Sequence, residues 1–295
     1  MPFSEFAFPM TINRDISLAV LTVLELSPPE MVAVAARCGY SHVGLRPIPA
    51  TPEEAHFPLL SDAMLRRDTI AALAQHRIGV LDVEILRLKP ETRASDFEAA
   101  LAFGAEVGAR FALVAGNDPD LARATDNFAA LCDLAATYRI RPHLEFMPWT
   151  NVPNIAVARR VATAANHANA GVLVDAFHLN RSGGAAADVP LSDPAFGYVQ
   201  LCDIAGPIPA DLAVLLQQAR AERLFPGEGD CDLVELLRRL PPAIPISLEV
   251  PRADLRARGL SPEDCARRAI ETARAVIQTA DSVSRAVVKE NGIVR

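Results

Sequence analysis

The chain has 295 residues, of which 51% are hydrophobic, and this is enough apolar material for a large buried core. Its formal net charge is −7 and its sequence pI is about 5.4, a balance that argues against nucleic acid or an anionic membrane as the main partner. We therefore expect a small molecule as the ligand, and the sequence leaves open whether the chain forms a homo-oligomer.

The cysteines and the N-terminal segment indicate the compartment. The five cysteines are scattered, odd in number and without a CxxC pair, which is typical of reduced thiols in a cytoplasmic protein. Residues 1–14 carry Glu5 early and have no basic segment followed by a long apolar run, so we expect no signal peptide. No apolar stretch reaches the roughly 18 residues that a membrane helix needs, so we expect no membrane span.

Short apolar runs alternate with helical patterns along the whole chain. The first helix has clear limits, because Ser27 suits its N-cap, Pro28 and Pro29 suit its first turn, Glu30 completes a capping box and Gly39 ends it. Similar signals predict strands at residues 16–21, 41–45, 78–85, 111–116, 141–146, 172–175, 197–203 and 244–250. They predict helices at residues 28–38, 62–75, 95–107, 119–138, 154–166, 210–221, 232–240 and 261–279.

Eight strands alternating with eight helices are typical of an α/β fold of the (β/α)8 TIM-barrel type. We expect a single barrel domain over residues 1–280, followed by a polar tail at 281–295 that is either helical or an interaction arm. The competing fold, an open doubly wound sheet, usually has a glycine-rich phosphate turn after its first strand. Residues 20–27 contain no glycine, so a nucleotide-binding sheet is disfavoured.

Polar residues end four consecutive predicted strands, the fifth to the eighth: Glu145, Asp175, Gln200 and Glu249. In a barrel, the carboxyl ends of the strands converge on one mouth. Three carboxylates there would repel one another unless a cation compensates them, so the pattern predicts one bound divalent metal ion. One such residue alone is more often a loop hydrogen-bonder or a helix cap. The oxygen-only ligand set favours Mg²⁺ or Mn²⁺, with Co²⁺ and Zn²⁺ as alternatives.

His178 follows Asp175 by three residues, and we expect it on a loop over the mouth. An imidazole with an ordinary pKa near 6.5 is suited to carry a proton there, and the alternative is a packed structural histidine. Asp203 and Asp82 are ambiguous, because each can orient a neighbouring side chain or cap a helix.

Arginines at strand ends and in loops can bind a substrate carboxylate or phosphate. We expect no more than two of them to do so, and the others to be solvated or paired with acidic residues. Trp149 lies beside a predicted ligand and either walls the pocket or belongs to the core. The loop at residues 226–230 has amides that suit a phosphate, although such turns are common. The candidate arginines are Arg46, Arg87, Arg181, Arg223 and Arg252.

These residues resemble the pattern of the xylose-isomerase-like barrels. That family includes sugar and sugar-phosphate isomerases and epimerases, inosose dehydratases, 3-dehydroshikimate dehydratases and, more distantly, endonuclease IV. Its pattern is a strand-five Glu, a strand-six Asp followed three residues later by His, a strand-seven His-x-x-Asp, a Pro-Gly-x-Gly loop and a strand-eight Glu. Here it falls on Glu145, Asp175 with His178, residues 200–203, residues 226–229 and Glu249. The resemblance covers nearly the whole chain and is strongest over residues 142–251.

One position departs from the pattern. Strand seven presents Gln200 where most members of the family have histidine. Glutamine can still bind a metal through its amide oxygen, and some dehydratases that this sequence is similar to have glutamine there. The endonuclease activity is disfavoured, because it uses a multinuclear zinc cluster and this chain has too few histidines at strand ends to build one.

The resemblance implies a metal-dependent enzyme that acts on a sugar, a sugar phosphate or a related hydroxy-ketone through an enediolate. For an isomerase or epimerase, it assigns the acid and base roles to Glu145 and Glu249. For a dehydratase of the 3-dehydroshikimate or inosose type, it assigns the base to His178. A third alternative, for which Gln200 is the only hint, is a barrel without catalysis that serves as a binding or regulatory subunit.

Overall fold

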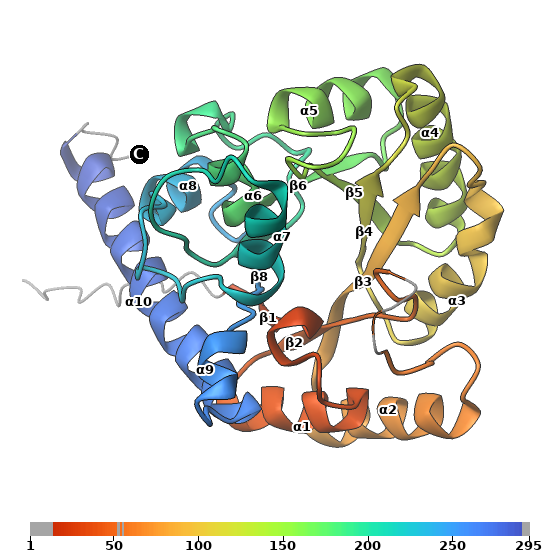
Figure 1. Ribbon diagram of the computed structural model, residues 1–295, viewed down its shortest axis with the longest axis horizontal. Coiled ribbons are helices and arrows are strands. Elements are labelled where there is room, and N and C mark those ends of the chain that lie inside the picture. Colours follow the sequence, from red (N-terminus) through yellow and green to blue (C-terminus); the bar gives the residue numbers. More distant parts are fainter. Residues whose placement is uncertain (1–13, 52–53, 55, 291–295) are drawn as a thin grey trace, which may run out of the picture.

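The eight strands of the computed structural model close into one parallel barrel in sequence order, and helices surround it (Figure 1). The structure describes residues 14–51, 54 and 56–290, so the N-terminal segment analysed for a signal peptide lies almost entirely outside the described residues. The predicted (β/α)8 fold is confirmed. The strands are β1 (Ile16–Leu18), β2 (His42–Leu45), β3 (Gly79–Leu88), β4 (Phe111–Gly116), β5 (Arg141–Glu145), β6 (Gly171–Asp175), β7 (Val199–Leu201) and β8 (Ile246–Leu248).

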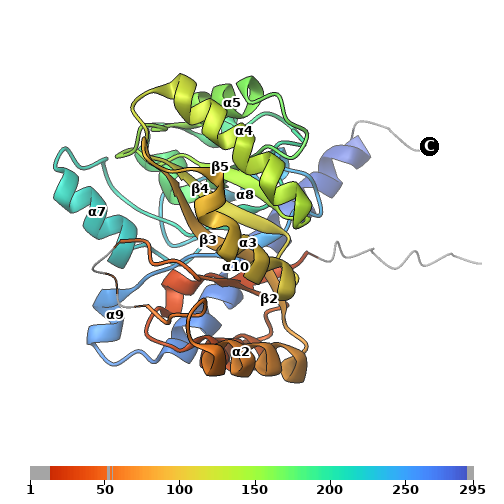
Figure 2. The same cartoon turned by 90° about the vertical axis from the view of Figure 1, so that its right-hand side faces the viewer.

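Ten α-helices and three 3₁₀ helices are found in the described residues. The α-helices are α1 (Pro28–Cys38), α2 (Ala63–His76), α3 (Glu98–Glu106), α4 (Leu121–Thr137), α5 (Ile155–Ala164), α6 (Ala176–Arg181), α7 (Leu212–Ala221), α8 (Leu233–Arg239), α9 (Ala253–Ala257) and α10 (Pro262–Glu290). The 3₁₀ helices are η1 (Val20–Val23), η2 (Ala94–Phe97) and η3 (Ala186–Asp188). Figure 2 shows α7 standing out from the ring of helices.

Local signals in the sequence explain most element ends. Ser27 and Glu30 form the predicted capping box of α1, and Gly39 ends that helix with φ +82°, a conformation that a Cβ atom would strain. Asp62 and Asp120 cap α2 and α4 by accepting hydrogen bonds from the first free amides.

Several predicted boundaries are wrong. β1 ends at Leu18 rather than at residue 21, because the chain turns into η1, and the short α9 was not predicted. α10 continues to Glu290, so residues 281–290 of the expected polar tail are helical, which is one of the two alternatives given for it; residues 291–295 lie outside the described residues. Within the described residues, no helix combines the length and the apolar character needed to cross a bilayer.

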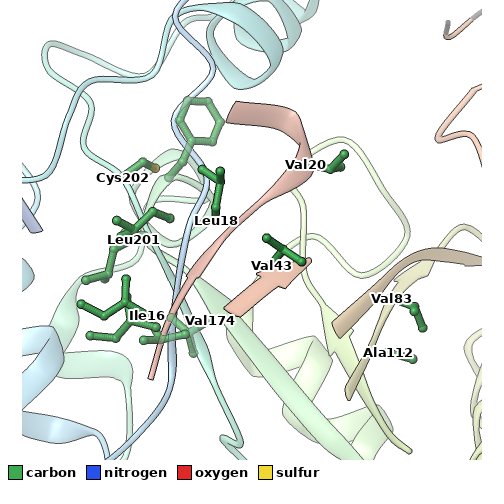
Figure 3. Close-up of a cluster of buried hydrophobic side chains, with 14 of the residues drawn as sticks. Ile16, Leu18, Val20, Val43, Val83, Ala112, Val174, Leu201 and Cys202 are labelled. Carbon is green, nitrogen blue, oxygen red and sulfur yellow. The ribbon is translucent and has the colours of Figure 1, made fainter. Parts of the chain in front are cut away.

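Side chains alternate between the two faces of the strands, and this alternation places the site. Outward residues such as Leu18, Val43, Val174 and Leu201 pack in the main core, between the barrel and the helices (Figure 3). Between these outward residues, the strands present polar residues toward the barrel axis. In register, Asp175 lies beside Gln200, Gln200 beside Ser247, and Glu249 follows Ser247 on the same face.

A second apolar cluster fills the barrel interior below the mouth. It includes Leu81, Leu113, Leu173 and Tyr198, and all of them are fully or almost fully buried. The five cysteines are free thiols, and four of them are buried, as the sequence predicts. The barrel is therefore a packed core with one polar end rather than a channel.

Candidate metal centre and active site

Three polar side chains converge at the carboxyl ends of β5, β6 and β7. Glu145 ends β5, Asp175 ends β6, and Gln200 lies at the centre of β7. None of the three is more than 2% exposed. In the orientation that satisfies its hydrogen bonds, the NH₂ group of Gln200 donates to Glu145 Oε1 at 2.9 Å and to Asp175 Oδ2 at 3.3 Å. The structure thus brings three of the predicted ligands together from three neighbouring strands.

This spacing fits a hard divalent cation. Mg²⁺ holds its oxygen ligands at about 2.1 Å in an octahedron, which puts neighbouring ligand oxygens about 3.0 Å apart. Without metal, the NH₂ group of Gln200 bridges the two carboxylates by donating to both. With an ion among these side chains, a half-turn of the amide would present its oxygen as a ligand instead. The amide orientation should therefore depend on whether metal is bound.

Arg223 is a permanent internal cation of this site. Its guanidinium donates to Asp175 Oδ2 at 2.7 Å and pairs with Glu249 Oε2 at 2.9 Å, and its Nε donates to the carbonyl of Ala219 at 2.8 Å. It is 2% exposed and lies over the ring of Phe177. Glu145, Asp175 and Glu249 carry three negative charges, so with Arg223 the site has a net charge of about −2, which one divalent ion would neutralise.

Glu249, the fourth predicted ligand, stands slightly apart. It follows β8 directly, is 5% exposed, and reaches Asp175 through Arg223. Burial raises its pKa to about 7, and the charge of Arg223 opposes that rise. Burial, and then the charges of Asp175 and Glu249, raise the pKa of Glu145 well above its ordinary value. In metal-free protein these carboxyl groups hold protons more strongly than exposed ones do.

His178 lies in the short helix α6 rather than on a loop, so that prediction is wrong. Asp175 is the N-cap of α6 and accepts a hydrogen bond from the His178 amide at 2.8 Å. The imidazole Nε2 lies 3.8 Å from Glu145 Oε1, and the ring meets the Trp149 indole edge-on at 5.1 Å. Burial lowers the pKa of His178 to about 3, so its ring is neutral at physiological pH.

His178 is also a candidate ligand. Among the acidic, histidine and cysteine side chains of the described residues, those of Glu145, Asp175 and His178 offer ligand atoms within 4.8 Å of one another. Glu249 lies outside that group. The sequence pattern gave no reason to prefer His178 to Glu249 as a ligand, because the distance depends on the turn of α6.

A cavity of about 300 Å³ opens above these residues. Glu145, His178, Arg223 and Glu249 line it, together with Arg46 after β2 and residues of β3. The predicted wall residue Trp149 also lines it. A cavity of this size accommodates a small polyol or sugar.

Glu84, from β3, was not assigned a role from the sequence, although it lines the cavity. It is 1% exposed, and its Oε1 lies 3.3 Å from Arg46 Nη2. Arg46 also pairs with Glu54 at 2.6 Å. Burial raises the pKa of Glu84 to about 7, against the effect of Arg46. Its place near the carboxyl end of β3 was the available signal, since barrel sites draw residues from several strands.

The predicted arginines fall into different environments. Arg46, Arg87 and Arg223 line the cavity. Arg181, 2% exposed, donates to the carbonyls of Ala205 and Gly206, and it is not among the cavity residues found in the described chain. Arg252 pairs with Asp254 outside the cavity. Arg220 of α7 also lines the cavity, and the sequence analysis missed it because nothing in the pattern distinguishes it from a solvated helix residue.

The loop after α7 is organised around Asp203, which is fully buried. Its carboxylate accepts hydrogen bonds from the amides of Ile204, Gly227 and Cys231, at 2.9 to 3.0 Å. The amides that were considered for a phosphate are therefore largely committed to the protein's own acceptors. The backbone of Asp203 also pairs with that of Leu224, the residue after Arg223. Asp203 thus helps to hold Arg223 in place.

The closed parallel barrel, with a cluster of acidic side chains at the carboxyl ends of its last four strands, places the chain in a class of TIM-barrel proteins. The chain belongs to the xylose isomerase-like TIM barrel family, whose model matches residues 32–276. No curated protein shows a significant sequence match to the chain.

Solved structures show the same fold at low sequence identity. A xylose isomerase-like TIM barrel/4-hydroxyphenylpyruvate dioxygenase fusion protein is 20% identical, with a TM-score of 0.74; the match covers 96% of this chain and 45% of the fusion protein. The IolI protein with a bound zinc atom is 18% identical, with a TM-score of 0.72, over 90% of this chain and 99% of that one. The D-allulose 3-epimerase from Methylomonas sp., in complex with D-allulose, is 16% identical, with a TM-score of 0.65, over 90% and 98%.

Proposed function

We propose that the protein is a divalent-metal-dependent isomerase or epimerase that acts on a sugar, a sugar phosphate or a related hydroxy-ketone. The observation that carries this proposal is the convergence of Glu145, Asp175 and His178, with Gln200 hydrogen-bonded to both carboxylates, beside a cavity that Glu249 also lines. The IolI protein of the same fold binds zinc, and the D-allulose 3-epimerase binds a ketose, which supports the proposal.

Glu145, Asp175, Gln200 and Glu249 would hold the metal, and their oxygen-only chemistry favours Mg²⁺ or Mn²⁺ over Zn²⁺. When bound, the ion would act as a Lewis acid that stabilises the enediolate of the substrate. Asp175 and Gln200 are ligands without a proton-transfer role in this scheme. Arg223 orients Asp175 and Glu249, because its guanidinium contacts one oxygen of each.

Proton transfer would fall to Glu145 and Glu249. Both line the cavity, and burial raises the pKa of each, that of Glu249 to about 7, so that the protonated and the ionised form are both accessible to Glu249 near neutral pH and Glu145 holds a proton more strongly than an exposed carboxylate does. Removal of a proton beside the carbonyl by one carboxylate, and return of a proton by the other, would give epimerisation or isomerisation.

A metal-dependent dehydratase is the second candidate function, and His178 favours it. Its imidazole lines the cavity with Nε2 3.8 Å from Glu145 Oε1, so it can reach a substrate proton there, although a pKa lowered to about 3 by burial makes it a weaker base than an exposed histidine. The probable 3-DHS dehydratase AsbF from Bacillus anthracis has the same fold, with 12% identity and a TM-score of 0.67. In this alternative, His178 takes the proton and a hydroxyl on the next carbon leaves.

Metal binding and turnover test the proposal separately. We expect wild-type protein to bind about one Mn²⁺ in calorimetry, and Glu145→Ala and Asp175→Ala variants to bind at least about tenfold more weakly. Glu106→Ala, at an exposed ion pair, is the matched control. Equal Mn²⁺ binding in all four proteins would remove the basis of the proposal.

A substrate panel of ketoses and 3-dehydroshikimate then separates the candidates. Deuterium uptake from solvent without a new chromophore indicates an isomerase or epimerase, whereas ultraviolet absorbance from a conjugated product indicates a dehydratase. Turnover of any substrate in this panel by the metal-bound protein would exclude the alternative that the chain is a non-catalytic binding or regulatory subunit.

A further inference from the structure

Four arginines line the cavity, and they differ in their partners. Arg223 pairs with Asp175 and Glu249, and Arg46 pairs with Glu54 and Glu84. Arg87 and Arg220 make no ion pair within the described part of the chain. The half-buried Arg87 is the more informative of the two, because a charge removed from solvent is normally compensated by an acidic partner.

Arg87 is held in place by neutral groups. Its Nε donates to the carbonyl of Ala50 at 2.8 Å, and its Nη1 donates to Asn117 Oδ1 at 3.3 Å. Glu54, the nearby carboxylate, is already used, since its oxygens accept from Arg46 and from the amide of Ala50. The guanidinium of Arg87 is therefore oriented, half-buried and not neutralised by these contacts.

Arg220 adds a second positive charge to the lining of the cavity. It lies in the last turn of α7, the helix that stands apart in Figure 2, and it is exposed. Burial lowers the pKa of Arg87; among the nearby charges, that of Glu145 raises this pKa and that of Arg220 lowers it. The two guanidinium groups thus repel each other, and an anion bound to both would remove that repulsion.

The carboxylates of Glu145 and Glu249 and the guanidinium groups of Arg87 and Arg220 line the same cavity. We propose that Arg87 and Arg220 form a subsite for an anionic group of the substrate, a carboxylate or a phosphate, while the hydroxy-ketone end faces Glu145 and Glu249. This inference rests on the proposed function in using the same cavity, and it restricts the substrate to acidic sugars or sugar phosphates. Guanidinium groups match both anions through paired N–H donors.

Binding of three six-carbon ketoses tests the subsite without requiring turnover. D-Fructose is neutral, D-fructuronate carries a carboxylate at the sixth carbon, and D-fructose 6-phosphate carries a phosphate there. We expect calorimetry on wild-type protein with Mn²⁺ to give at least about tenfold tighter binding for one of the charged ketoses than for D-fructose. Preference between the two charged probes distinguishes a carboxylate site from a phosphate site.

Matched variants test whether Arg87 and Arg220 cause the preference for a charged ketose. Arg87→Gln and Arg220→Gln should each weaken binding of the preferred anion about tenfold and leave D-fructose and Mn²⁺ binding unchanged. Arg160→Gln, exposed on α5, removes the same charge elsewhere and should change none of the three. Arg220 is exposed, so its variant keeps the test valid even if Arg87→Gln unfolds.

The inference is wrong if no charged ketose binds wild-type protein more tightly than D-fructose, including the case in which none of the probes binds. It is also wrong if Arg220→Gln binds the preferred anion as tightly as Arg160→Gln does. Failure of the proposed function would give a different result, namely that wild-type protein does not bind Mn²⁺. The two results are distinguishable because neither arginine contacts a proposed metal ligand.

Discussion

Removal of the Arg223 guanidinium should be among the most damaging substitutions in this barrel. Arg223→Met keeps most of the side-chain volume and deletes a charge that is 2% exposed and pairs with Asp175 at 2.7 Å and Glu249 at 2.9 Å. At an effective dielectric constant of 20, one such pair is worth about 4 kcal/mol before desolvation. Breaking a buried pair by removal of one partner costs about 3 to 5 kcal/mol, and we expect a loss of stability in this range.

The loss should depend on pH in a defined direction. Without Arg223, the buried carboxylates lose the charge that keeps the pKa of Glu249 from rising further. At about pH 8 the ionised form of Glu249 is left without its counter-ion, whereas at about pH 5.5 Glu249 can take up a proton and so relieve part of the cost. The difference in stability between wild type and Arg223→Met should therefore be larger at the higher pH.

Urea unfolding followed by circular dichroism, in metal-free buffer at both pH values, measures this difference. Arg181→Met is the matched control, because Arg181 is equally buried but donates to neutral groups, so its substitution should show no comparable pH dependence. A loss below about 1 kcal/mol for Arg223→Met at about pH 8, or an equal pH dependence in Arg181→Met, would refute the assignment of Arg223 as the internal counter-ion.

Three further predictions follow from the site. Burial raises the pKa of Glu84 from 4.5 to about 7, so the contribution of Glu84 to the stability of the metal-free protein should be greatest below pH 4.5 and be lost as pH rises to about 7. Glu84→Gln should remove about 3 kcal/mol of that slope in urea unfolding, and an unchanged slope would contradict the pKa. Gln200→His should shift metal preference toward Zn²⁺ over Mn²⁺ by roughly tenfold in competition titrations, because imidazole favours zinc; an unchanged ratio would place Gln200 outside the ligand set. Asp203→Asn should cost about 2 kcal/mol or more, since Asn cannot satisfy all three buried amides, whereas the exposed control Asp126→Asn should stay within about 0.5 kcal/mol; equal effects would show that the loop does not depend on Asp203.

The sequence was sufficient for the barrel because each element carries local signals. The capping box at Ser27 and Glu30, and the apolar run at 111–116, are recognisable without tertiary information, and both are present in the structure. Boundaries were less predictable where elements are very short. Helix α6 has 6 residues, and its start depends on the Asp175 side chain, so His178 was expected on a loop instead.

The residues of the site were also only partly predictable from the sequence. Glu145, Asp175 and Gln200 were recognisable because strand order brings them together. The partners of Arg223 were not, since its contacts with Asp175 and Glu249 join residues 48 and 26 positions apart through an irregular loop. Arg220 and Glu84 were missed for the same reason. Their roles depend on which side chains surround the cavity and how these are paired, and no spacing in the sequence predicts that.

Because side chains alternate between the two faces of a strand, neighbouring residues of one strand serve either the packing of the core or the chemistry of the site. Val199 and Leu201 anchor β7 to the outer core, while Gln200 between them faces the other ligands. A change at Gln200 therefore alters the site and leaves the anchoring contacts of its two neighbours intact. In proteins with this architecture, single substitutions of inward-facing residues can change the metal or substrate preference during evolution while the packing of the barrel stays the same.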